Sequence, residues 1–231
     1  MKQRTQTGFT LVEIAIVLVI IGLLLGGILK GQEMITQAKI KNVVADFSGI
    51  SAAYYGYQDR YRAIPGDDLN AATRWTTAPA AVSGDGNGQV GGSYNAACVQ
   101  VPVAATPESC KWWDHLRRAG FVAGNGGLQP FNAVTGQIGV QTGDGVAAGA
   151  GPTLLNAAGG NGFVGLLICS AGLPDKIAIA VDTQMDDGAS NLGTVRALLQ
   201  AAPNPNIGAA QVATAAYAET GTNIYVVCRS L

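Results

Sequence analysis

The longest apolar stretch of the chain begins with Gly8-Phe9-Thr10-Leu11-Val12-Glu13 and continues through residues 14–29. Between residues 9 and 29 the sequence holds a single charged side chain, that of Glu13. At about 1.5 Å per residue, a helix of this length spans roughly 30 Å, which is the thickness of the hydrocarbon core of a bilayer. A carboxylate inside such a span costs about 2.5–3.5 kcal/mol, so Glu13 needs a partner.

Two common kinds of apolar segment explain this stretch incompletely. A secretory signal peptide would have a shorter apolar core that ends in a small-residue cleavage site, and no A-x-A pattern closes this one. A plain membrane anchor accounts for the length and for the basic residues Lys2 and Arg4 before it. It does not account for Glu13, nor for Gly8 at the junction between the polar leader and the apolar run.

The stretch from Gly8 to Glu13 resembles the class III signal of type IV pilins and of type II secretion pseudopilins. The resemblance implies that a prepilin peptidase cuts after Gly8 and that the new amino-terminal residue, Phe9, is methylated. It also implies that Glu13 pairs with the amino terminus of a neighbouring subunit during filament assembly. The resemblance is specific over residues 1–61, and beyond them it rests on general shape.

The helical pattern continues beyond the apolar stretch. Apolar side chains recur at steps of three and four, which places them on one face of a helix; they are Ile40, Val43, Val44, Phe47, Ile50, Tyr54, Tyr57 and Tyr61. Pro65 and Gly66 then end the segment. The sequence therefore predicts one helix over residues 9–61, with 9–29 in the membrane or the filament core and 30–61 amphipathic.

Many pilins carry a proline inside the apolar helix, whereas this chain has none there. It has glycines instead, at positions 22, 26, 27 and 31. Each glycine lowers helix preference by roughly 1 kcal/mol relative to alanine, which favours a soft segment near Gly26 and Gly27. The spacing of Gly22 and Gly26 equally favours close contact between helices, so both interpretations stay open.

The predicted organisation is a leader peptide over residues 1–8, the long helix over 9–61, and a disulfide-bonded globular head over 62–231. Within the head, apolar patterns and turn residues predict short helices over 69–75, 112–120 and 174–185, and strands over 163–169, 194–199 and 224–228. A strand over 177–181 is the alternative to the last of these helices. The stretch 123–162 is rich in small and polar residues and predicts hairpins or loops. The implied fold class is α+β, with a long amino-terminal helix packed on a small antiparallel β-sheet with large loops.

The charge composition excludes one class of partner. The formal net charge is −1, from 14 basic and 15 acidic residues, so no nucleic-acid surface is expected. Charged residues make up 13% of the chain, against a usual share of about 25%. This low share is typical of a small core with long loops, or of surfaces that neighbouring copies cover.

The four cysteines, Cys98, Cys110, Cys169 and Cys228, all follow the apolar stretch. If this part of the chain is exported, oxidation to two disulfides is expected, and three pairings are open. We favour Cys98 with Cys110, which closes a short loop, and Cys169 with Cys228, which fastens the last strand to the core. A zinc site is not expected, because the chain has no C-x-x-C motif and one histidine.

The densest acidic group of the predicted head consists of Asp182, Asp186 and Asp187, followed by Gly188. Carboxylate-rich loops with glycine can bind Ca²⁺, and some pseudopilins that this chain resembles hold a calcium loop near the carboxyl terminus. The spacing does not match the EF-hand pattern. The alternative interpretation is a helix end followed by a turn, because Asp-Asp-Gly is common in turns.

No catalytic motif is found in the sequence. It has no G-x-S-x-G, H-E-x-x-H or Walker motif. Gly86, Gly88 and Gly91 match a dinucleotide fingerprint formally, but no predicted strand precedes them. His115 is the only histidine and is expected to have a structural or surface role. The chain is therefore predicted not to be an enzyme but a substrate of one, the prepilin peptidase.

The predicted function is that of a structural subunit of a type IV pilus-like filament. One alternative is a pseudopilin of a type II secretion system, and another is a minor or tip pilin that binds a ligand through residues 76–162. Before assembly, the chain is expected to cross the inner membrane once, with its carboxyl-terminal domain in the periplasm. It then joins a homo- or hetero-polymer with other pilins, at the cell surface or as a periplasmic pseudopilus.

Overall fold

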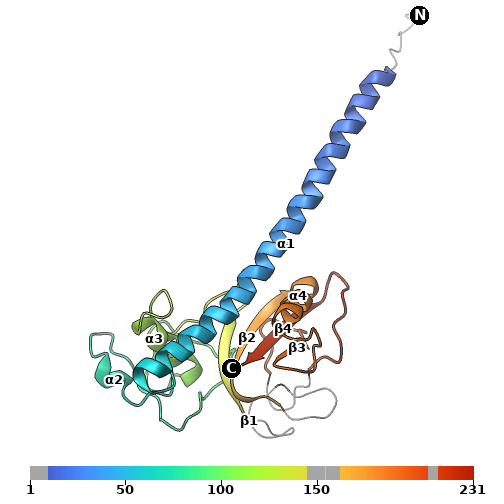
Figure 1. Ribbon diagram of the computed structural model, residues 1–231. Coiled ribbons are helices and arrows are strands. Elements are labelled where there is room, and N and C mark those ends of the chain that lie inside the picture. The colour runs from blue at the N-terminus through green and yellow to red at the C-terminus, as the bar shows by residue number, and fades with distance from the viewer. Residues whose placement is uncertain (1–9, 145–153, 155–161, 208–212) are drawn as a thin grey trace, which may run out of the picture. The chain divides into compact units, whose positions relative to one another are not determined.

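The computed structural model describes residues 10–144, 154, 162–207 and 213–231. Its longest element is helix α1, Leu11–Tyr61 (Figure 1). The chain forms two compact units, Met1–Lys39 and Ile40–Leu231, and α1 contributes to both. The helix ends at Tyr61, where the apolar pattern predicts its end.

In the first unit, the described residues belong almost entirely to α1. An 18-residue window of this helix has a mean hydropathy of 2.8, and none of it is buried. The helix is thus long and apolar enough to cross a membrane. It is unbroken at Gly26 and Gly27, and a methyl group at either position would meet no atom within 4 Å.

In the second unit, the rest of α1 forms part of the core. Its buried face carries Ile40, Val43, Phe47, Ile50, Ala53 and Tyr57. These side chains belong to one apolar cluster with Trp112 and Trp113, with residues of the following helices, and with one face of the sheet. The spacing of three and four residues that predicts this face is therefore confirmed by its burial.

The sheet has four antiparallel strands in the order β1-β2-β4-β3. Their bounds are Ile138–Asp144 for β1, Val164–Pro174 for β2, Val195–Leu199 for β3 and Ile224–Ser230 for β4. Alternate residues of a strand face opposite sides of a sheet. Ile168 accordingly lies in the cluster with α1, whereas Leu167 and Cys169 lie in a second cluster on the other face. The predicted α+β class with a small antiparallel sheet is confirmed.

Three shorter helices complete the second unit: α2, Ala71–Arg74; α3, Glu108–Arg118; and α4, Asp175–Met185. Helix α3 begins four residues before the position predicted from its aromatic pair, directly after Pro107, and Gly120 follows its end with a φ of 81°. Strand β1 occupies part of the stretch for which hairpins or loops were expected. The helical interpretation of residues 174–185 agrees with α4.

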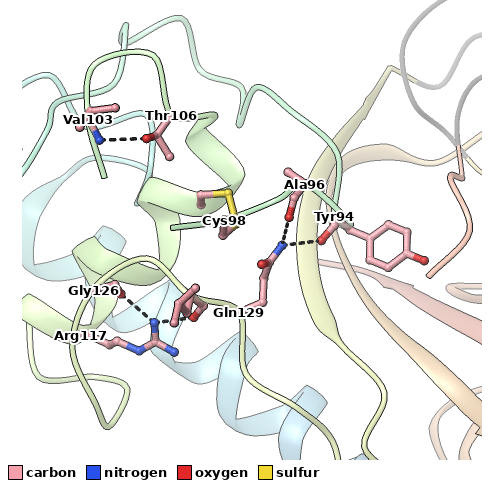
Figure 2. The surroundings of a disulfide bond; sticks show 10 residues. Tyr94, Ala96, Cys98, Val103, Thr106, Arg117, Gly126 and Gln129 are labelled. Carbon is pink, nitrogen blue, oxygen red and sulfur yellow. Dashed lines mark hydrogen bonds between the residues drawn. A yellow bond between two sulfur atoms is a disulfide. The ribbon is translucent and has the colours of Figure 1, made fainter. Parts of the chain in front are cut away.

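Both disulfides join the cysteines that the spacing favours. Cys98–Cys110 fastens a loop to α3 (Figure 2). Cys169–Cys228 links directly opposite residues of β2 and β4. The described residues contain no free cysteine. The second disulfide thus covalently joins the last strand to the centre of the sheet.

Candidate functional site

Glu13 lies in the first turn of α1 and bonds to the residue that precedes the helix. Its Oε2 accepts hydrogen bonds of 2.8 Å from both the backbone N–H and the hydroxyl group of Thr10. The backbone N–H of Glu13 in turn donates to Oγ1 of Thr10 at 3.3 Å. This reciprocal pattern is a capping box, which satisfies N–H groups that the first helical turn leaves without partners.

The capping box gives Glu13 a role within its own chain, in addition to the role in assembly that its position in the motif predicts. The signal was present, because Thr10 and Glu13 stand three residues apart directly before an apolar run. A carboxylate at this position also lies near the positive end of the helix dipole. Gly8 and Phe9, the predicted cleavage and methylation residues, lie outside the described residues.

The apolar side chains that follow Glu13 are available for contact. Leu11, Leu18 and Leu23 expose 91%, 65% and 73% of their surface, and the other large apolar residues up to Leu29 are also exposed. Monomeric soluble proteins rarely expose contiguous apolar patches of this size. The exposed apolar surface of this part of α1 is thus suited to contact with lipid or with other apolar helices.

In the second unit, the last turns of α1 are joined to the turn and helix that follow. The hydroxyl group of Tyr57 donates to Oδ2 of Asp68, and Nη1 of Arg74 donates to the same oxygen. The Arg74 guanidinium also lies over the ring of Tyr61, 4.2 Å from its centroid. Burial alone would raise the pKa of Asp68, but hydrogen bonds from Arg74 and Tyr57 bring it below its ordinary value.

His115 lies on α3 and is fully buried. Its ring contacts the backbone of two segments that precede α3 in the chain. Its Nδ1 accepts a hydrogen bond of 2.9 Å from the N–H of Gly66, and its Nε2 lies 2.8 Å from the carbonyl oxygen of Val82. A ring that accepts at Nδ1 and donates at Nε2 is a neutral imidazole. Burial lowers the pKa of His115, in keeping with this state. The contacts are those of a structural residue.

The acidic group predicted from the sequence is brought together by the end of α4. Carboxylate oxygens of Asp182, Asp186 and Asp187 lie within 4.8 Å of one another. Burial raises the pKa of Asp182, and the charges of the two neighbouring aspartates raise it further. This geometry leaves both interpretations of the sequence open, a calcium loop and a helix end followed by a turn.

These carboxylates also have partners within the protein. Asp182 accepts hydrogen bonds from the Tyr217 hydroxyl group at 2.7 Å and from the N–H of Gly188 at 3.2 Å. Asp186 accepts from the N–H groups of residues 194 and 195. Asp187 accepts from the N–H of residue 189. This arrangement supports the interpretation of the group as a helix end and a turn.

A second acidic group was not predicted. Carboxylate oxygens of Asp67, Asp85 and Glu108 lie within 4.8 Å of one another. Asp67 accepts from the N–H groups of residues 87 and 88, and Glu108 from those of residues 85 and 91. The two buried carboxylates therefore hold the glycine-rich loop 84–92 in place. Asp67 and Glu108 are distant from each other in the sequence, so their spacing does not indicate an acidic group. The glycine-rich loop between them is the only feature of the sequence that points to this region.

Comparison with known families identifies one segment of the chain. Residues 3–29 match the model of the prokaryotic N-terminal methylation motif, which is the class III prepilin signal of type IV pilins and pseudopilins. The resemblance carried by Gly8 to Glu13 is thus confirmed over this segment, which supports a place for the chain among type IV pilins or pseudopilins. Comparison with curated proteins and with solved structures found no match.

Proposed function

We propose that this chain is a structural subunit of a type IV pilus-like filament. Prepilin peptidase cuts the precursor between Gly8 and Phe9, and the new amino-terminal Phe9 is methylated. The observation that carries the proposal is the methylation motif at residues 3–29, which leads into an apolar helix with no buried residue in its membrane-length window. Such a surface is stable in the inner membrane before assembly and among other apolar helices after it.

Glu13 is proposed to guide each subunit into the growing filament. Cleavage leaves an ammonium group on Phe9, which is costly in an apolar setting unless a negative charge lies close to it. The carboxylate of Glu13 on a neighbouring helix supplies that charge. Within one chain this carboxylate accepts hydrogen bonds from Thr10, so it has a partner before assembly. Entry into the filament would exchange these local bonds for an ion pair between subunits.

The second unit is proposed to lie in the periplasm before assembly and on the filament afterwards. Its two disulfides support this location, because disulfides persist in oxidising compartments. The basic leader supports an inner-membrane orientation in which the amino terminus stays cytoplasmic. The proposed partners are the prepilin peptidase, the inner membrane and other pilin subunits.

A pseudopilin of a type II secretion system would use the same amino-terminal segment in the same way. It would be found in a short periplasmic filament rather than in a fibre on the cell surface. A minor or tip pilin would share the segment as well, and would be scarce relative to the main subunit. The location and abundance of the assembled chain therefore distinguish these alternatives from a major pilin.

Substitutions in the motif separate processing from assembly. Glu13→Ala is expected to leave cleavage after Gly8 largely intact, measured by the mass of the chain, but to deplete it from the sheared filament fraction. Thr10→Ala removes the capping hydroxyl and keeps the carboxylate, so filaments should persist. Glu33→Gln, which removes an exposed carboxylate paired with Lys30 on the same helix, is the matched control. Normal filament yield from Glu13→Ala would contradict the proposed role.

A further inference from the structure

In the described part of the second unit, two asparagines are each followed by a glycine, in Asn87-Gly88 and in Asn125-Gly126. An asparagine before a glycine is prone to deamidation, because the glycine nitrogen approaches the side-chain carbonyl carbon with no Cβ in the way. Both asparagines are exposed. Sequence and exposure therefore do not distinguish the two sites, and the contacts of each site decide which one reacts.

The reaction closes a five-membered ring within the chain. The glycine nitrogen gives its proton to water or hydroxide and bonds to Cγ of the asparagine, while the bond from Cγ to Nδ2 breaks and ammonia leaves. Water then opens the resulting succinimide at either carbonyl group, which gives aspartate or isoaspartate. Overall, one water molecule is consumed and one ammonia is released. Hydrogen bonds from the glycine N–H or from the amide group must break first, so they slow the reaction.

At Asn87 the folded chain holds both nitrogens that take part. The N–H of Gly88 donates to Oδ2 of the buried Asp67 at 2.8 Å, and Nδ2 of Asn87 donates to Oδ2 of Asp85 at 2.9 Å. Oδ1 of Asn87 accepts from the N–H of Gln89 at 2.8 Å. Hydrogen bonds to charged acceptors are about twice as strong as those between neutral groups. The fold therefore protects Asn87.

At Asn125 the corresponding nitrogens are free. The N–H of Gly126 and Nδ2 of Asn125 have no hydrogen-bond partner among the residues that the structure describes. The contacts fall on oxygens instead, because Nε2 of Gln100 donates to the backbone oxygen and to Oδ1 of Asn125, each at 3.0 Å. A donor at Oδ1 stabilises the negative charge that develops there when the glycine nitrogen attacks. These bonds join neutral groups, so they restrain Asn125 less than the carboxylates restrain Asn87.

The surroundings also favour the product at Asn125 over the product at Asn87. Arg117 donates from Nη1 to the carbonyl oxygen of Gly126 at 2.7 Å (Figure 2), and it forms no salt bridge within the described part of the chain. Arg117 and Asn125 line the same pocket, so a carboxylate at position 125 gains a cation nearby. A carboxylate at position 87 would instead face Asp85 in the acidic group, where like charges repel.

We propose that Asn125 is a site of spontaneous modification, which converts to aspartate and isoaspartate through a succinimide with Gly126 while Asn87 stays intact. The change adds one negative charge to a chain whose formal net charge is −1 and places it near Arg117. Because the released ammonia is lost to solvent, the modified fraction rises with the age of the protein. The inference concerns the second unit alone and holds for a pilus subunit or a pseudopilin.

The test uses the full-length chain, purified soon after synthesis and incubated in detergent micelles at mildly alkaline pH. Digestion and mass spectrometry at successive times give the modified fraction of each asparagine, and fragment ions separate Asn125 from Asn161, which lies outside the described residues. We expect Asn125 to react about tenfold faster than Asn87 or more, the ratio that one hydrogen bond to a charged group supplies. In denaturant the two rates should become similar. Equal rates in the folded chain would overturn the proposal, and so would an undiminished preference in denaturant, because neighbouring sequence would then explain it.

Three variants check the contacts that carry the inference. Asp67→Asn removes the charged acceptor of the Gly88 N–H and should speed the reaction at Asn87 by about fivefold or more, with Asn125 in the same sample as the internal control. Asn125→Asp reproduces one product and should keep or raise the melting temperature, whereas Asn87→Asp should lower it. An unchanged rate at Asn87 in the first variant, or a lower melting temperature for Asn125→Asp than for Asn87→Asp, would contradict the proposal.

Discussion

The hydroxyl group of Tyr57 lies 2.6 Å from Oδ2 of Asp68, and both side chains are buried. The same oxygen accepts a hydrogen bond of 2.6 Å from Nη1 of Arg74. These contacts join the last turns of α1 to the turn and helix after it. Because a buried carboxylate is stable only with such partners, the three side chains act as one structural unit.

Replacing Tyr57 with phenylalanine should destabilise the second unit by about 1–3 kcal/mol, because Asp68 loses one buried donor while the aromatic ring remains. Chemical denaturation of the full-length chain in micelles would measure the change. Tyr55→Phe is the matched control, because Tyr55 is exposed on the same helix and donates no hydrogen bond among the described residues. Equal stability of the two variants would show that the Tyr57 contact contributes little.

The stability of the second unit should fall as the pH drops below about 6.5, the ordinary pKa of histidine. Burial lowers the pKa of His115 in the folded chain, so the unfolded chain takes up a proton first and unfolding is favoured. The loss continues until the pH reaches the folded pKa. Melting temperatures between pH 8 and pH 5, compared with those of His115→Gln, isolate this contribution.

His115 is the only histidine, so nuclear magnetic resonance gives a direct check on that prediction. A single imidazole signal should titrate below about pH 6.5 in the folded chain. A titration at or above the ordinary value would contradict a neutral, buried His115. It would also remove the expected difference in pH dependence between the native chain and His115→Gln.

Two glycines of α1 should respond differently to alanine. A methyl group at Gly56 would lie 2.8 Å from the ring of Phe121, whereas one at Gly49 would meet no atom within 4 Å. Gly49→Ala should therefore stabilise the helix by about 1 kcal/mol, the usual gain in an exposed helix. Gly56→Ala should gain less or lose stability, because Phe121 must move. Equal gains by denaturation would show that the Phe121 ring moves without cost.

The two acidic groups, at the end of α4 and at the glycine-rich loop, are expected to keep their conformation without a bound metal ion. Their carboxylates accept hydrogen bonds from the chain itself. Adding a chelator should therefore leave the melting temperature of the full-length chain unchanged. A lower melting temperature that calcium restores would instead establish a calcium site. Asp187→Asn, in the group at the end of α4, and Asp85→Asn, in the group at the glycine-rich loop, would then identify which of the two binds the ion.

The long helix was predictable because its signal is local. Apolar residues at steps of three and four are packed on the sheet, and Phe47 and Tyr57 are almost fully buried as that spacing requires. The polar start of α3 was harder to predict, because Glu108 and Ser109 are buried and form hydrogen bonds with the loop 84–92, which precedes the helix by more than ten residues. Strand β1 contains two glycines and polar residues, so its pairing with β2 rather than local preference sets its conformation.

The assembly segment was predictable from its motif, but the hydrogen bonds between Glu13 and Thr10 within that segment were not predicted. Glu13 was expected to need a partner, and the structure supplies one within the chain through Thr10. The acidic group at Asp67, Asp85 and Glu108 had no comparable signal. It is assembled from segments that only the folded second unit brings together, so sequence spacing alone does not reveal it.

The proposal that the chain is a filament subunit is tested most directly by immunogold electron microscopy of intact cells, with antibody against residues 62–231. Gold along surface fibres is the result that a major pilin predicts. Gold only at fibre tips would identify a minor or adhesive subunit, and label that requires permeabilisation would favour the secretion pseudopilus. Label spread over the membrane without any filament would contradict the account, because the chain would then be an anchored protein that does not assemble.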